Sequence, residues 1–282
     1  MQFEIFTDSS ASLDEETIKK YEIAVLEVPI TVDGKDMTGA KLKDLYEFMR
    51  KKMDVKTSLV NTDGFVRGFE KALKEGKDIL YTGICAALSG TFSCAVSAAG
   101  ILREKYPERK IVLVDSKSIS LGTGLLIMEA CEMRLKGKSI EEVEEYIKTE
   151  REKVNHLVCV SDLFYVKRSG RISEVEAVLG TLAGVRPLMH VNEEGYVKVY
   201  GKTVGKKRAF LRMIEKVVSN IKEGSVIGIA HCDCLPDAEF VKEKIKKFLP
   251  NKIKIAYVDP VIGTHAGPDA LAIIFFGKNR AI

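Results

Sequence analysis

The chain has 282 residues, of which 46% are hydrophobic and 30% charged, the composition of an ordinary globular protein with room for one large domain or two smaller ones. Its 44 basic residues are offset by 40 acidic residues in the same segments, which leaves no basic surface of the kind that binds DNA or RNA. The first residues form no secretory signal, and the longest apolar runs are shorter than a membrane span, which needs about 18 residues. We therefore expect a cytoplasmic protein without stable membrane insertion.

The first half of the chain alternates strand-like and helix-like segments. Strands are predicted at residues 3–7, 24–32, 79–84 and 111–114. Helices are predicted at residues 12–21, 42–53, 65–74 and 91–106, then from about residue 122, and last at residues 139–154. Ser12 with Glu15, and Ser139 with Glu142, form capping-box patterns that open two of these helices. Strands separated by helices imply crossover connections and a largely parallel sheet.

The second half of the chain begins after the charged helix that ends near residue 154. A strand is predicted at residues 156–160, a basic glycine-containing turn at 164–173, and a hairpin of residues 187–192 and 196–202. An amphipathic helix at residues 206–221, a strand at 226–230, a helix at 236–248 and strands at 253–258 and 270–276 complete the chain. We therefore predict an α/β protein with two α/β domains, residues 1–154 and 155–282.

Polar loops follow three strands of the predicted parallel sheet, at residues 8–10, 88–91 and 115–118. Each loop alone has the composition of an ordinary helix cap. In parallel sheets, however, the ligand usually lies at the carboxyl ends of the strands, and all three loops belong to that edge. Together they predict a binding site there.

Two segments with paired hydroxyls are suited to an anion. Ser89 and Thr91 supply hydroxyls at the start of a helix whose backbone N–H groups are unpaired, and Gly90 would let an anion approach the backbone. Thr57 and Ser58 offer a second pair of hydroxyls just before the helix that starts near residue 62. These residues are the first candidates for the site.

A histidine completes the set of candidates. His265 lies in the Gly/Pro-rich segment of residues 259–268, predicted as a rigid loop between two strands. An imidazole can donate a hydrogen bond to an anion, and the small neighbours would let a ligand come close. The alternative is a histidine whose hydrogen bonds are satisfied inside its own loop.

The chemistry of this set favours a small anion such as a carboxylate. Hydroxyls, backbone amides and one imidazole suit a single negative charge, and the chain has neither a P-loop nor a Rossmann fingerprint. The nucleophile elbow of serine hydrolases is also absent. Two alternatives stay open. One is a serine-dependent esterase or phosphotransfer enzyme, in which Ser89 and His265 form a nucleophile–base pair oriented by Asp259 or by Asp269, of which Asp269 better fits the start of a strand. The other is a regulator that binds another small anion.

The cysteines indicate neither a disulfide framework nor a metal centre. The six are dispersed and stand in mostly apolar surroundings, typical of small buried side chains. Cys232 and Cys234 beside His231 could ligate a soft metal, but the cluster has no second half. We expect no metal and no cofactor.

At these residues the chain resembles the DegV family of bacterial fatty-acid-binding proteins, and the similarity covers essentially its whole length. Each motif is weak alone, and the ordered set is highly specific. The motifs are Thr7-Asp8-Ser9-Ser10, Thr57-Ser58, Leu88-Ser89-Gly90-Thr91, Val114-Asp115-Ser116, Lys167-Arg168-Ser169-Gly170-Arg171-Ile172-Ser173 and Gly263-Thr264-His265-Ala266-Gly267-Pro268.

The resemblance implies two α/β domains with a long-chain fatty acid between them. It implies that Thr57, Ser89 and His265 bind the carboxylate, and that the protein is a carrier rather than an enzyme. Some members present the carboxylate to a separate ATP-dependent fatty acid kinase, which forms an acyl phosphate for phospholipid synthesis. By similarity, this chain would be the non-catalytic subunit of such a system.

Two departures from the family pattern concern the carboxylate segment and the kinase. The segment that starts at Thr57 lacks the Gln-Pro of the family's Thr-Ser-Gln-Pro-Ser, so its turn is expected to differ in shape. Val204 stands where kinase-partnered members have an arginine, before Gly205-Lys206-Lys207. The second departure leaves lipid binding intact and puts the kinase partnership in question.

The energetics of a fatty acid divide between its two ends. About 14 buried methylenes at roughly 0.8 kcal/mol each contribute about 11 kcal/mol, far more than hydrogen bonds to the carboxylate. Arg168 and Arg171 either neutralise the carboxylate or cap backbone carbonyls of their turn. Phe164, Leu182 and Met189 are candidates for the apolar lining, although plain core is the better interpretation of all three.

Overall fold

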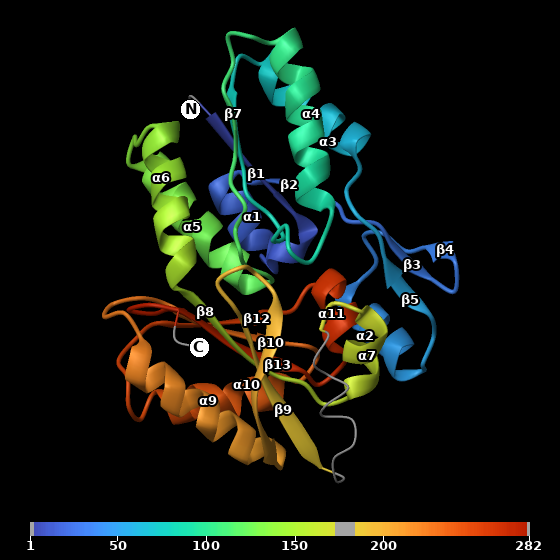
Figure 1. The fold of residues 1–282 in the computed structure, drawn as a ribbon, viewed down its shortest axis with the longest axis vertical. Helices are drawn as coiled ribbons and strands as arrows, with labels where there is room; N and C mark the ends of the chain where they lie inside the picture. Colours follow the sequence, from blue (N-terminus) through green and yellow to red (C-terminus); the bar gives the residue numbers. More distant parts are fainter. Residues whose placement is uncertain (1–2, 173–183, 281–282) are drawn as a thin grey trace.

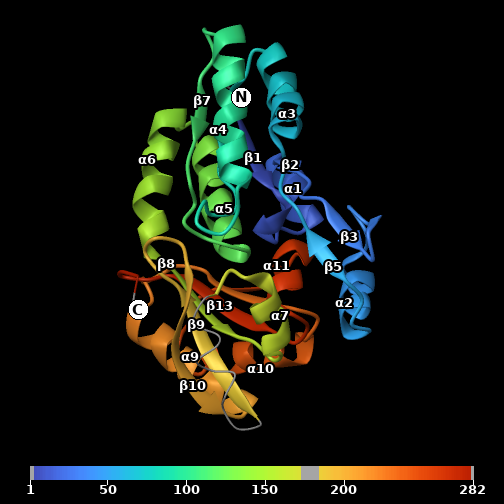
Figure 2. The same cartoon turned by 45° about the vertical axis from the view of Figure 1, so that its right-hand side comes forward.

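The computed structural model describes residues 3–172 and 184–280, and its first lobe is built on a parallel sheet (Figure 1). The strand order is β2-β1-β6-β7, and every neighbouring pair runs parallel, as predicted. The strands are β1 (Phe3–Asp8), β2 (Ala24–Leu26), β6 (Asp78–Tyr81) and β7 (Ile111–Leu113). Their carboxyl ends point towards the rest of the molecule, which brings the three polar loops to the boundary between the lobes (Figures 1 and 2).

Helices cover both faces of this sheet. On one face Phe6 packs with α3 (Thr62–Lys74) and α4 (Thr91–Lys105). On the other face Ile5 packs with α1 (Glu15–Tyr21), α5 (Leu121–Leu135) and α6 (Ile140–Glu150). Adjacent residues of β1 therefore serve opposite cores, because successive side chains of a strand alternate in direction.

The second lobe is a six-stranded mixed sheet with the order β10-β9-β8-β13-β11-β12. Helices α9 (Lys206–Asn220) and α10 (Leu235–Ile245) pack on one face, and the other face points towards the first lobe (Figure 2). The predicted hairpin is confirmed as the antiparallel pair β9 and β10. The strands are β8 (Val154–Cys159), β9 (Val185–Val191), β10 (Val197–Val204), β11 (Ile227–His231), β12 (Ile253–Tyr257) and β13 (Leu271–Phe276).

A small subdomain from the first half of the chain packs against the second half. It contains α2 (Leu42–Arg50) and a three-stranded sheet of β4 (Lys35–Asp36), β3 (Ile30–Val32) and β5 (Val55–Thr57). The Tyr46 hydroxyl donates to the carbonyl of Val258 at 2.9 Å, and Arg50 lies 3.1 Å from the Asp269 carboxylate. The predicted boundary after residue 154 assigns α2 to the first domain. These contacts, however, join α2 to residues of the second domain.

Two predictions in the first half were wrong. Residues 24–32 form two strands of different sheets rather than one, because Pro29 lacks an N–H and interrupts the strand. Ser12 does not cap α1: the Asp14 side chain accepts from the N–H of Thr17 at 2.7 Å, and Ser12 itself has a left-handed φ of 51°. The second capping box, Ser139 with Glu142, is confirmed.

Two segments predicted as turns or loops are short helices. The basic segment forms α7 (Leu163–Ser169), which ends at Gly170 with a φ of 63°. The segment around His265 forms α11 (Pro260–Ala266), whose first residue is a proline and whose N-cap is Asp259. Seven residues are too few for a visible apolar period, so capping signals alone distinguish these helices from loops.

The strands β4 and β5 were not predicted, although β5 ends at Thr57, and the other helices and strands lie within a few residues of their predicted positions. All six cysteines are free thiols, and five of them are buried. Over residues 3–172 and 184–280, no helix combines the length and the apolar character needed to cross a bilayer. Over the same ranges, no cluster of three His, Cys, Asp or Glu side chains is arranged to hold a metal ion.

Candidate functional site

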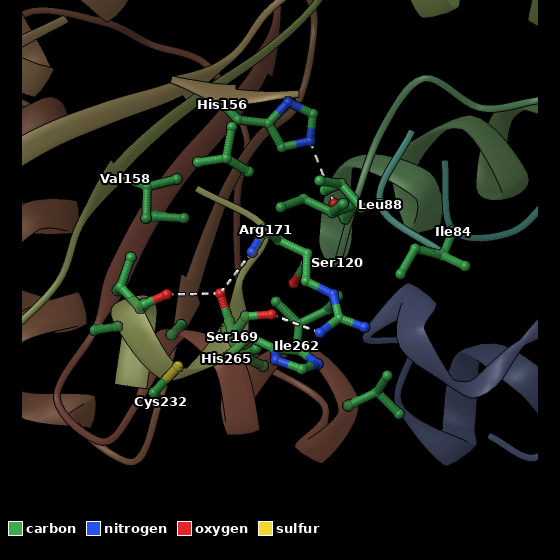
Figure 3. A pocket seen from close by; sticks show the side chains of 18 of the residues that line it. Ile84, Leu88, Ser120, His156, Val158, Ser169, Arg171, Cys232, Ile262 and His265 are labelled. Carbon is green, nitrogen blue, oxygen red and sulfur yellow. Dashed lines mark hydrogen bonds between the residues drawn. The ribbon is translucent and has the colours of Figure 1, made fainter. Parts of the chain in front are cut away.

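A largely apolar pocket lies between the six-stranded sheet and the loops of the first lobe (Figure 3). Its floor is the face of that sheet opposite α9 and α10, with Val158 and Val160 from the segment of β8 and Ala272 and Ile274 from β13. Residues two apart on a strand share a face, which explains the regular spacing of the floor. Ile84, Leu88, Ile119 and Ile262 line the pocket from the loops and from α11.

The three predicted carboxylate-binding residues all line this one pocket. Thr57 is the last residue of β5, Ser89 precedes α4, and His265 lies in α11. The Thr57 hydroxyl is 3.0 Å from Nε2 of His265, although 208 positions separate them in sequence. The structure therefore brings residues from three distant segments to the same cavity.

The supporting hydroxyls are held at the start of α4 and the end of β5. The hydroxyls of Ser89 and Thr91 are 2.9 Å apart, and the N–H of Thr91 donates to the Ser89 hydroxyl at 3.2 Å. Ser58 also lines the pocket, and it is exposed, as is Gly90. Gly90 itself lies outside the pocket lining and opens α4. The hydroxyl-rich end of the cavity therefore lies near the protein surface.

His265 is neutral near pH 7. Burial, and next the positive charges of Arg171 and Arg168, lower its pKa to about 4. A neutral imidazole donates from one ring nitrogen and accepts at the other, so His265 can bond to Thr57 and to a ligand at once. A bound anion would offset the effect of burial and of the two arginines, and would raise the pKa of His265.

The two candidate arginines of the basic motif differ in position. Arg171 lines the pocket, and its guanidinium donates to the carbonyl of Ser169. Arg168 lies outside the pocket lining, donates to the carbonyl of Val55 at 2.9 Å, and is 3.6 Å from the Asp54 carboxylate. Arg171 is therefore the guanidinium that a ligand would meet.

The candidates for the apolar lining have different positions as well. Met189 lines the pocket and is buried. Phe164 lies outside it and is 51% exposed. Leu182 lies outside the described residues, as does Ser173 of the basic motif.

Sequence reasoning missed His156 and Ser120 in the pocket wall. Figure 3 shows His156 at the side of the pocket opposite His265. Nε2 of His156 lies 2.9 Å from the Ser118 hydroxyl and 3.2 Å from the carbonyl of Ile119. Burial, and next the charge of Arg280, lower its pKa to about 3, so the His156 imidazole is neutral near pH 7. The alternation that places Val158 and Val160 on the floor also places His156 there, and this was the available signal.

The contacts of Ser89 do not form a nucleophile–base pair. Ser89 bonds to Thr91, and the ring of His265 bonds to Thr57. The Asp259 carboxylate bonds to Ser12 and to the N–H of Ile262, so it does not orient the histidine directly. No hydrogen bond joins Ser89 to His265 in the part of the chain that the structure describes.

Comparison with known proteins gives a consistent result over the whole chain. Residues 2–278 match the family model described as "Uncharacterised protein, DegV family". A DegV domain-containing protein of Clostridium perfringens is 36% identical over 99% of both chains. The crystal structure of a fatty acid binding DegV family protein from Streptococcus agalactiae superposes with a TM-score of 0.87 at 29% identity, covering 99% of this chain and 100% of that one. A Thermotoga maritima structure described as revealing fatty acid binding function has a TM-score of 0.81 at 25% identity, covering 97% and 98%.

Proposed function

This chain belongs to the DegV family, and on that premise we propose that it carries a long-chain fatty acid in the pocket between its lobes. The carboxylate binds to Thr57, Ser89 and His265, with Arg171 nearby, and the acyl chain lies on the apolar sheet face. The observation that carries the proposal is that Thr57, Ser89 and His265 line one largely apolar cavity, with the Thr57 hydroxyl 3.0 Å from Nε2 of His265. The structural relatives described as binding fatty acids support it.

The arrangement of polar and apolar surface matches the two parts of a fatty acid. Burying the acyl chain on a floor of valine, alanine and isoleucine supplies most of the affinity. Leaving the carboxylate near exposed Ser58 and Gly90 avoids the cost of burying an unpaired charge. Hydroxyls and a neutral imidazole then fix which end of the ligand faces the surface.

We further propose that the protein is not an enzyme but presents the carboxylate to a separate ATP-dependent kinase. A carboxylate held near the surface is the geometry that such a transfer needs. Val204, 60% exposed at the end of β10, replaces an arginine of the kinase-partnered pattern, so the partner's identity is left open. The proposal places the protein in the cytoplasm, where six unpaired cysteines would stay reduced.

The direct test is the ligand content of the purified protein. Protein purified from a bacterial host, denatured and examined by mass spectrometry, is expected to release long-chain fatty acid of the host. Protein that has never been delipidated and releases none would contradict the proposal. A short polar ligand in its place would favour the regulator, and turnover of a simple ester abolished by Ser89→Ala would favour the esterase.

His265→Ala tests the role of the polar end. Losing one hydrogen bond to a charged group is expected to weaken fatty-acid binding about tenfold, because the acyl chain still supplies most of the affinity. Kinase-coupled phosphorylation should fall much further, since it depends on the position of the carboxylate. His265→Gln, which retains an N–H donor, serves as the matched control. Equal phosphorylation by wild type and His265→Ala would remove His265 from the proposed mechanism.

A further inference from the structure

Three polar side chains behind the pocket wall form a continuous hydrogen-bond chain. Ser120 lines the pocket, and its hydroxyl oxygen lies 2.8 Å from that of Ser12. The Ser12 hydroxyl donates to Oδ2 of Asp259 at 2.6 Å, and the N–H of Asp259 donates back to Ser12 at 3.1 Å. Ser12 and Ser120 belong to the first lobe and Asp259 to the second, so this relay joins the two lobes. All three residues are buried.

The relay ends on the helix that carries His265. Oδ1 of Asp259 accepts from the N–H of Ile262 at 2.9 Å and so caps the first turn of α11. Asp259 contacts neither the pocket nor His265, and it acts on the site through the position of this helix. Ser12 and Ser120 have φ values of 51° and 52°, which non-glycine residues rarely adopt. The relay bonds therefore link two strained positions to the helix of His265.

The direction of the relay depends on one proton. A hydroxyl donates one hydrogen bond and accepts two. When Asp259 is ionised, the Ser12 hydroxyl donates its hydrogen bond to the carboxylate and accepts one from Ser120, so Ser120 offers only acceptors to the pocket. When Oδ2 of Asp259 is protonated, it donates to Ser12, Ser12 donates to Ser120, and the Ser120 proton is free to point into the pocket.

The surroundings of Asp259 allow both states. The titratable groups around it are the Asp8 carboxylate from β1, the Tyr46 hydroxyl from α2 and the Cys232 thiol after β11, and none of them is cationic. Burial, and also the charge of Asp8, raise the pKa of Asp259 to about 7, against hydrogen bonds from Ser12 and Ile262 that lower it. Asp259 and Ser12 also line a second pocket between the lobes, with Asp14 and Tyr257, which gives water a route to the carboxylate.

We propose that Asp259 is a positioning residue whose relay through Ser12 to Ser120 couples fatty-acid binding to the uptake of one proton. The inference rests on the proposed function, because it takes the ligand to be a carboxylate. Binding brings a negative charge into the pocket, and a proton from solvent adds to Oδ2 of Asp259. The protonated carboxyl keeps Oδ1 as the cap of α11, removes the repulsion, and turns the Ser120 hydroxyl into a donor facing the pocket.

Calorimetric titration with palmitate tests this coupling. In two buffers of different ionisation enthalpy at pH 7, wild-type protein is expected to take up part of one proton per palmitate bound, and to bind about fivefold more tightly at pH 6 than at pH 8. Asp259→Asn keeps an oxygen for the N–H of Ile262 and donates to Ser12, as protonated aspartate does. This variant should show no proton uptake and should bind at both pH values with the affinity of wild type at pH 6.

Ser120→Gly is the second variant, because glycine suits the positive φ and removes the hydroxyl together with the β-carbon. It should reduce the pH dependence without changing the melting temperature of the apoprotein by more than a few degrees. Equal wild-type affinity at pH 6 and pH 8 would overturn the inference. So would proton uptake that persists in Asp259→Asn, which would assign the proton to His265. Failure of the wild-type protein to bind palmitate at either pH would overturn the proposed function as well.

Discussion

The two ends of the pocket are built in different ways. Its apolar floor comes from neighbouring strands of one sheet, where residues such as Val158 and Ala272 face the same side. Its polar end comes from β5, the loop before α4, and α11, with one residue of the proposed carboxylate site from each. In the proposed complex, affinity is shared by many floor residues, whereas the orientation of the fatty acid depends on the placement of three separate segments of the chain.

Filling the floor should have the largest effect on binding. Ala272 is 9% exposed and lines the pocket, and Ala272→Phe would displace about four methylenes of the acyl chain. At roughly 0.8 kcal/mol for each methylene, the binding free energy falls by about 3 kcal/mol. The Kd for palmitate, measured by calorimetry, should therefore rise about 100-fold. Val204→Phe, at an exposed position of β10, is the matched control and should bind normally. A folded Ala272→Phe protein with wild-type affinity would show that the chain lies elsewhere.

The histidine at the far side of the pocket should make the fold sensitive to acid. The pKa of His156 is about 3 in the folded protein, compared with 6.5 for an ordinary histidine. Above pH 6.5 neither state binds the proton, and below it only the unfolded chain does, so the free energy of unfolding falls as pH is lowered. At pH 5 the expected loss is about 2 kcal/mol.

Urea denaturation at pH 7.5 and pH 5 measures this loss. In His156→Asn the free energy of unfolding should fall less between pH 7.5 and pH 5 than it does in wild type, by about 2 kcal/mol. Bound palmitate should restore the part of the lost unfolding free energy that comes from His265, because the protonated imidazole would gain a counter-anion. The part that comes from His156 should remain lost. A variant with the same pH dependence as wild type would mean that His156 is accessible to protons in the folded state.

The smallest expected effect separates two neighbouring arginines. Arg171→Leu should weaken palmitate binding about threefold, because an exposed guanidinium near a carboxylate contributes below 1 kcal/mol. Arg168→Leu should leave binding unchanged and lower the melting temperature, since the carbonyl of Val55 loses its donor. Calorimetry and thermal melting of the two variants side by side check both outcomes. Equal effects on binding would show that their positions in the structure do not determine their roles.

The fold was predictable where local pattern decides it. Alternating strand and helix periods predicted the parallel sheet, and Glu193-Glu194-Gly195 between two strand patterns predicted the β9–β10 hairpin. The sequence pattern gave the wrong structure where a side chain bonds to a distant residue instead of to its own helix. Ser12 has the sequence of a helix cap, but its hydroxyl bonds to Asp259, 247 positions away, and Asp14 caps α1 in its place.

The site was predictable in composition but not in contacts. Hydroxyl-bearing loops identified Ser89 and Thr57, a Gly/Pro-rich segment identified His265, and the family resemblance assigned all three to one carboxylate. The bond between Thr57 and His265, and the relay from Ser120 to Asp259, join residues whose separation in sequence carries no local signal. Distinguishing Arg171 from Arg168 required the direction of each side chain, which spacing alone does not give.

The position of α2 has a consequence for how the protein is made. Tyr46 is fully buried, and its hydroxyl bonds to a carbonyl 212 residues later in the chain. On the ribosome, α2 emerges long before that partner exists, so its apolar face stays uncovered until translation is nearly complete. A fragment that stops at residue 154 would expose the same face permanently and should aggregate. The strand that ends at Thr57 packs against α11 as well, so we expect the site to be complete only after the last part of the chain has been synthesised.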